Sequence, residues 1–196
     1  IKQITEERMK LEEELVYPSH NDPISLFWLL RTLDGVRPTG SIIVNDILSI
    51  HADPCSVMSL ETSSSYVSSN ACIDGYGLPA GLGVQLSLTA QELPVIVLTS
   101  DESIMQCSEA LWSVAHYQLP IKIVIVSAGG AALLIQPQTP AQIGFPFNSP
   151  TIDFQKMGQA MGLKVFTATI MEEMEEAITR LFEEEGPCVL NVKVSG

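Results

Sequence analysis

The sequence has little basic charge. It contains 10 lysines and arginines against 23 aspartates and glutamates, which gives a net charge of −13. A protein that binds nucleic acid neutralises phosphates with clustered basic residues, so this composition argues against nucleic acid as a partner. The acidic residues gather in segments with few basic residues to offset them, at 6–7, 12–14 and 172–185. The last of these is typical of a solvated helix face.

Long apolar runs are also missing. No stretch approaches the roughly 18 consecutive apolar residues that a membrane-spanning helix needs. The first residues follow a polar helical pattern rather than that of a signal peptide, so we expect a cytoplasmic protein that does not enter the membrane. The chain is nevertheless 46% hydrophobic and only 17% charged. This surplus of apolar residues predicts an interface buried in a homo- or hetero-oligomer.

The four cysteines do not form a framework. Cys55, Cys72, Cys107 and Cys188 are scattered and lack the paired spacing of a zinc site. We interpret them as reduced core thiols of a cytoplasmic protein rather than as disulfide partners.

Two apolar runs, at residues 95–98 and 121–126, organise the chain. An amphipathic segment separates them, which predicts a βαβ unit. Neither run alternates with polar residues, so both strands should be covered on both faces, as in a parallel sheet. We therefore predict a doubly wound α/β fold with about six mainly parallel strands and helices on both faces. Ligands of such sheets bind at the carboxyl ends of the strands, here residues 99–103 and 127–130.

The remaining segments extend this pattern. Residues 1–16 are expected to form a helix or a linker, and residues 17–196 a single domain. Further helices are predicted at 22–33, 76–88, 109–120, 153–161 and 172–184. Further strands are predicted at 41–44, 163–167 and 188–194. Residues 45–51 should be a loop, residues 61–70 an extended connection, and residues 131–150 a proline-containing loop of the lid type.

Three short motifs carry a resemblance. Residues 75–80 read Gly-Tyr-Gly-Leu-Pro-Ala, residues 100–103 read Ser-Asp-Glu-Ser, and residues 127–130 read Ser-Ala-Gly-Gly. In order and spacing they resemble the Gly-Phe-Gly-Leu-Pro-Ala, Gly-Asp-Gly-Ser and Asn-Asn-Gly motifs of the thiamine-diphosphate-dependent 2-oxoacid decarboxylase and acetolactate synthase family, especially its benzoylformate decarboxylase branch. The resemblance implies the thiamine-diphosphate-binding fold of that family's C-terminal, diphosphate-binding domain.

The resemblance also implies site residues. It assigns magnesium ligation to the Asp101 carboxylate and the Gly130 carbonyl, and contacts with thiamine diphosphate to Asp74, Gly75, Ser103, Ser127 and Gly129. A helix N-cap explains Asp101 equally well. The family's cofactor lies between this domain and a pyrimidine-binding domain, which supplies an activating glutamate. We expect that partner on another chain or in a missing segment.

The sequence departs from the family at four positions. Ala128 replaces a metal-ligating asparagine, and Ser100 and Glu102 replace the glycines that flank Asp101. Asp74, or Ile73 after a slip of one residue, stands where a bulky apolar residue supports the cofactor. These changes favour a non-catalytic scaffold or regulatory partner. The alternative is the cofactor-binding part of an active decarboxylase or lyase, completed by the pyrimidine-binding domain.

Overall fold

The computed structural model describes residues 17–47, 53–60, 62, 65–69, 73–88, 94–128 and 150–195. The predictions for residues 1–16, for Gly129 and Gly130, and for the loop at 131–149 lie outside these residues. No helix in the described ranges is both long enough and apolar enough to cross a membrane.

Six parallel strands form one sheet in the order β2-β1-β3-β4-β6-β5. This confirms the predicted doubly wound α/β fold. The strands, in chain order, are β1 Ile42–Asp46, β2 Tyr66–Ser68, β3 Val95–Ser100, β4 Lys122–Ser127, β5 Lys164–Ala168 and β6 Cys188–Lys193.

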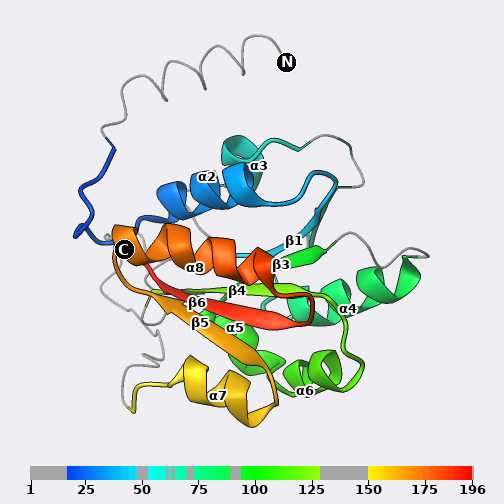
Figure 1. The fold of residues 1–196 in the computed structure, drawn as a ribbon. Helices are drawn as coiled ribbons and strands as arrows, with labels where there is room; N and C mark the ends of the chain where they lie inside the picture. Colours follow the sequence, from blue (N-terminus) through cyan, green and yellow to red (C-terminus); the bar gives the residue numbers. More distant parts are fainter. Residues whose placement is uncertain are drawn as a thin grey trace, which may run out of the picture.

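Helices cover both faces of the sheet (Figure 1). The described helices are α2 Leu26–Val36, α3 Pro54–Val57, α4 Gly77–Ser87, α5 Asp101–Gln106, α6 Glu109–His116, α7 Phe154–Ala160 and α8 Met171–Glu183. One hydrophobic core lies between the sheet and α2, α3 and α8, and the other between the sheet and α4 to α7. All six residues of β3 are buried, as a strand covered on both faces requires.

Two of the predicted segments had wrong boundaries, whereas the predicted extended connection at 61–70 was confirmed where the structure describes it. Helix α2 begins at Leu26 and is capped by Ser25. It does not begin earlier because Pro23 and Ile24 form isolated β-bridges with Ile170 and Val194. Strand β1 runs to Asp46 rather than ending at Val44, because its last residues pair with β3. The connection at 61–70 contains the edge strand β2, which pairs with β1.

The cysteines do not all lie in the core. Cys107 and Cys188 are buried, as predicted, whereas Cys55 is exposed next to the capping residue of α3. The prediction for Cys55 was therefore wrong, and Cys72 lies outside the described residues.

The connections that follow β1 and β3 run along opposite faces of the sheet. The connection from β1 passes through α3, and the connection from β3 passes through α5 and α6 on the other side (Figure 1). Because β1 and β3 are neighbours, the chain diverges at their carboxyl ends. Such a switch point is the usual place for a ligand crevice in a doubly wound sheet.

Candidate functional site

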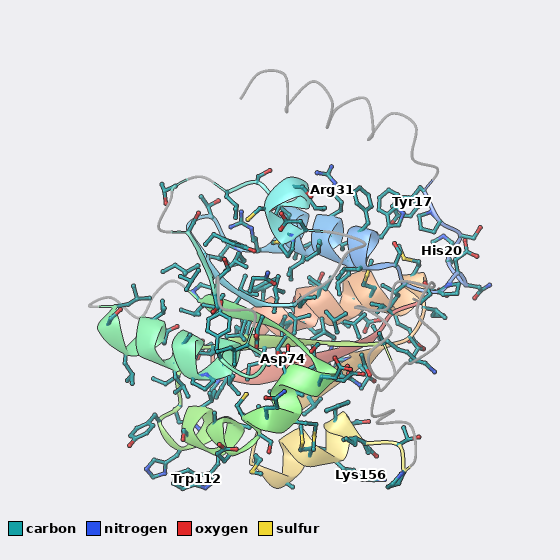
Figure 2. All side chains as sticks on the ribbon, turned by 180° about the vertical axis from the view of Figure 1, so that it is seen from behind. Tyr17, His20, Arg31, Asp74, Trp112 and Lys156 are labelled. Atoms are coloured by element: carbon teal, nitrogen blue, oxygen red, sulfur yellow. The ribbon has the colours of Figure 1, made fainter. Side chains whose placement is uncertain are left out.

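The carboxyl ends of β1 and β3 bring together three segments of the chain. These are the end of β1 at Asp46, the turn at Asp74 and Gly75 that leads into α4, and the first residues of α5. Figure 2 shows Asp74 beside α5 near the centre of the molecule. Three of the residues assigned by the resemblance, Asp74, Gly75 and Ser103, therefore lie at one place.

Ser103 links these segments. Its side chain is fully buried, and its hydroxyl oxygen lies 3.3 Å from both the Asp46 backbone carbonyl and Asp74 Oδ1. A serine hydroxyl carries one hydrogen, so it donates to one of these acceptors at a time. Both acceptors belong to the protein itself. The donor that the resemblance assigns to the cofactor is thus already engaged.

Asp101 is the first residue of α5 and is only 3% exposed. Its Oδ1 accepts a hydrogen bond from the Glu102 backbone N–H at 3.1 Å. The N-cap is Ser100, whose hydroxyl oxygen accepts from the Ser103 N–H at 3.0 Å. The N-cap interpretation of Asp101 was therefore wrong by one residue. Residues 99–103, which we predicted to form the carboxyl end of a strand, include the last two residues of β3 and the first three of α5.

Asp46 was missed as a site residue because we placed it in a loop. It is 2% exposed, and its Oδ2 accepts hydrogen bonds from the backbone N–H groups of Gly75 at 3.2 Å and Gly77 at 3.1 Å. A Cβ on Gly77 would lie 2.4 Å from Asp46 Cβ, so only glycine allows this approach. An acidic residue two positions after the apolar run that ends at Val44 was the available signal.

Carboxyl groups crowd this end of the sheet. Burial and, to a smaller extent, the nearby Asp74 raise the pKa of Asp46 to about 6, despite the two N–H donors. The pKa of Glu102 is raised by burial, then by Asp101 and Asp74. Asp74 thus makes ionisation of both Asp46 and Glu102 less favourable. Among the described residues, no three His, Cys, Asp or Glu side chains form a group that suits a metal ion.

A cavity of about 220 Å³ adjoins this cluster between the ends of β1 and β2. The residues that line it include Asp46, Asp53, Tyr66 and Tyr76. The Tyr76 hydroxyl donates to the Asn45 carbonyl at 2.7 Å, which holds the turn before α4 against β1. No described residue that lines this cavity is basic. Its chemistry therefore suits a hydrogen-bond donor better than an anion.

The second predicted loop is described only in part. Ser127 ends β4, one residue beyond the pairing of Val126 with Ser100, and is half-buried. Ala128 is also half-buried and packs against the core between the sheet and α2, α3 and α8. Gly129 and Gly130 lie outside the described residues, so their predicted roles stay predictions.

The residue before Gly75 also differs from the expected apolar support. Asp74 is half-buried and contacts Ser103, whereas Ile73 is 62% exposed. Of the two alternatives from the sequence, the carboxylate rather than the isoleucine points into the site.

Known proteins resemble this chain over most of its length. The acetolactate synthase large subunit of Pyropia yezoensis is 32% identical over 126 residues, which cover 62% of this chain and 21% of that protein. The benzoylformate decarboxylase of Pseudomonas aeruginosa is 26% identical over 167 residues, covering 82% of this chain and 30% of that protein. This chain thus spans less than a third of the length of these relatives.

A solved structure shares the fold. The thiamine diphosphate-dependent 4-hydroxybenzoylformate decarboxylase of Rhodococcus jostii RHA1 aligns with a TM-score of 0.77 and 25% identity, over 93% of this chain and 34% of that one. The family model described as "Thiamine pyrophosphate enzyme, C-terminal TPP binding domain" matches residues 54–192. This match covers more than half of the sequence, and the chain therefore belongs to the thiamine pyrophosphate enzyme family, as its C-terminal TPP binding domain.

Proposed function

We propose that this domain is a non-catalytic member of its family, which keeps the fold as a scaffold or regulatory partner and does not hold magnesium thiamine diphosphate in the family's manner. The observation that carries this proposal is the contact between Asp74 and Ser103. A carboxylate of the protein lies within hydrogen-bond distance of the hydroxyl donor, at the point where a phosphate oxygen is expected.

Electrostatics supports this reading. Asp46, Asp74, Asp101 and Glu102 gather at the strand ends, and the pKa of Glu102 is raised by burial, Asp101 and Asp74. A unit charge of the same sign at about 4 Å costs on the order of 4 kcal/mol at an effective dielectric constant near 20. A diphosphate placed among these groups would add negative charge to a site that already disfavours it.

Ligand chemistry points the same way. Magnesium requires oxygen ligands in near-octahedral geometry. Ala128 offers only a methyl group where the family has an amide oxygen. Asp101 remains as a carboxylate ligand, but it stands beside Glu102 rather than between two glycines. The residues present therefore do not fit the family's metal and diphosphate group, and we assign no catalytic step to it.

The length of the relatives supports a partner domain, because this chain matches only a part of each. The relatives named above are three to five times as long as the part that this chain matches. We propose that the domain assembles with a pyrimidine-binding domain, on another chain or elsewhere in a longer protein, as a homo- or hetero-oligomer.

One observation favours a second candidate function. Asp101 is almost completely buried at the carboxyl end of β3, where the resemblance places the metal-ligating aspartate. If it binds magnesium, the domain is the cofactor-binding part of a thiamine-diphosphate-dependent decarboxylase or lyase.

Calorimetry separates the two candidates. We expect no heat of binding when thiamine diphosphate and Mg²⁺ are titrated, at ligand concentrations up to about 1 mM, into the chain in the presence of a pyrimidine-binding domain partner. The same titration of a variant that combines Asp74→Met, Glu102→Gly and Ala128→Asn should give binding, and thiamine without its diphosphate is the control ligand. Micromolar binding to the unaltered chain would overturn the non-catalytic proposal and establish the second candidate.

A further inference from the structure

A groove of about 450 Å³ runs between α2 and α8, on the face of the sheet that α4 to α7 do not cover. The two helices lie side by side (Figure 1). They begin at the same end of the groove, because Pro23 and Ile170, which precede them, form a β-bridge. Trp28 and Glu175 line the groove near that end. Further along each helix its lining includes Gly35, Val36 and Thr179.

The chain itself enters this groove at the end where the helices begin. Traced back from α2, it runs along α8: the His20 carbonyl accepts from the Glu172 N–H at 3.0 Å, and the Tyr17 hydroxyl donates to Glu175 Oε1 at 2.6 Å. The Tyr17 ring also packs edge to face against Trp28, with ring centroids 4.9 Å apart. A chain that keeps this direction before Tyr17 reaches the rest of the groove.

The far part of the groove presents apolar surface to solvent. Val36 is 40% exposed, and Tyr17 at the entrance is 55% exposed. A Cβ added to Gly35 would meet no atom of the described residues within 4 Å, so there is open space above this position. The groove therefore has room for a further segment of chain beyond Tyr17.

Residues 1–16, which precede Tyr17, have a sequence that suits this surface. Ile4, Leu11 and Leu15 are spaced i, i+7 and i+11, which places them in one stripe of a helix, and Glu6 and Glu13 fall on the opposite side. At 1.5 Å per residue a helix of these residues is about 24 Å long, whereas α2 is about 16 Å long. Such a helix is long enough to cover the groove from Tyr17 to its far end.

We infer that residues 1–16 form a helix that docks in the groove between α2 and α8, with Leu11 and Leu15 facing Val36 and the open space above Gly35. Because the segment is tethered at Tyr17, its effective concentration at the groove is on the order of millimolar, so a small contact is enough to hold it.

Charge supports this occupant. Glu12 and Glu14 flank the apolar stripe of the segment, and Arg31 provides a positive charge in the groove. Figure 2 shows Tyr17 and Arg31 on the same side of the molecule, away from Asp74. The inference therefore concerns a surface separate from the strand ends and does not depend on whether the cofactor binds. A docked segment would fix where the chain enters this domain.

Trypsin tests the docking in the full chain, since it can cleave the segment after Arg8 and Lys10. Gly35→Glu combined with Val36→Glu places two carboxylates in the groove, close to the glutamates of the segment. Cleavage at these sites should become about tenfold faster than in the unaltered chain, because the protease acts on the undocked segment.

The matched control for cleavage is Leu86→Glu, which adds a charge at an exposed apolar residue of α4 on the other face of the sheet and should leave the rate unchanged. Circular dichroism checks that each variant is folded. Equal cleavage rates in the groove variant and the control would overturn the inference. Protection that increases with protein concentration would place the segment on a second copy and would also overturn docking within one chain.

Tryptophan fluorescence tests the segment's side of the contact. The chain has two tryptophans, so Trp112→Phe leaves Trp28 in the groove as the only one. In this background Leu15→Asp should undock the segment and raise acrylamide quenching of Trp28 by about twofold. Met9→Asp, which lies off the apolar stripe, is the matched control and should leave quenching unchanged. Equal quenching in the two variants would refute the contact, and calorimetry with thiamine diphosphate is independent of either result.

Discussion

Two buried charged groups lie at opposite ends of the strands of the same sheet, and their surroundings differ. At the start of β4, Lys122 is 3% exposed, and its ammonium group donates to the carbonyls of Gly186, at 2.9 Å, and Glu184. At the end of β1, Asp46 is 2% exposed and accepts from two backbone N–H groups, but the Asp74 carboxyl group nearby disfavours its charge.

The difference separates stability from function. The Lys122 ammonium satisfies carbonyls just beyond α8 and joins that end of the helix to the sheet, so its charge is compensated. The charge of Asp46 is opposed by burial and by Asp74, although its hydrogen bonds are made. Groups that conflict in this way concentrate at present or former functional sites, because selection there favours something other than stability.

Removing the compensated charge should have the largest effect. Lys122→Met leaves the two carbonyls without their donor, and we expect it to lower the free energy of unfolding by about 3–5 kcal/mol, since each hydrogen bond involves a charged group. Urea denaturation measures this. Lys193→Met, at an exposed position of β6, is the matched control and should cost about 0.5 kcal/mol or less. Equal losses of unfolding free energy in the two variants would contradict the proposed contrast between Lys122 and Asp46.

The charge of Asp46 should have a smaller effect on the free energy of unfolding, and this effect should depend on pH. The pKa of Asp46 is raised from 3.8 to about 6 in the folded chain. The folded state therefore binds the proton more tightly than the unfolded state, and this contribution to stability is present below pH 3.8 and lost as the pH rises through about 6. Asp46→Asn keeps an acceptor oxygen but does not titrate.

We therefore expect the free energy of unfolding of the unaltered chain to fall, relative to that of Asp46→Asn, by about 1–3 kcal/mol between pH 4 and pH 6.5. Urea titrations of both proteins at several pH values provide the comparison. If the difference in free energy of unfolding between the two proteins stays constant across this range, the charge of Asp46 is well compensated, as the charge of Lys122 is.

The smallest effect is expected from Asp74→Asn. This change removes one of the crowded charges and keeps an acceptor for the Ser103 hydroxyl. The pKa of Asp46 should fall by about 0.5 or less, because the effect of Asp74 is minor beside that of burial. Titration of the Asp46 carboxyl carbon by NMR measures the shift. A rise in the pKa of Asp46 would contradict the proposed repulsion.

The central unit shows how far sequence reasoning reached into the fold. The apolar run at 95–98 lies inside β3, and all but the first residue of the run at 121–126 lie inside β4; the parallel sheet with two covered faces follows from these runs. Boundaries were less predictable. The end of β1 was misplaced because Asn45 and Asp46 are polar, yet both continue the ladder with β3.

The contacts within the site were harder to predict from the sequence than the fold. Ser103 meets the Asp46 carbonyl across 57 positions of sequence and the Asp74 carboxylate across 29. The resemblance singled out Ser103 and Asp74 separately, but no local pattern indicated that they bond to each other. Asp46 entered the cluster only through the pairing of β1 with β3.

The sequence by itself determined the layers of this protein, because continuous apolar strands must be covered on both faces wherever they occur. Only the tertiary structure decided which polar groups meet at the strand ends. That meeting depends on strand order and register, which join distant segments and leave no periodic trace in the chain. The buried Asp46, the contact between Asp74 and Ser103 and the compensated Lys122 are all products of that order.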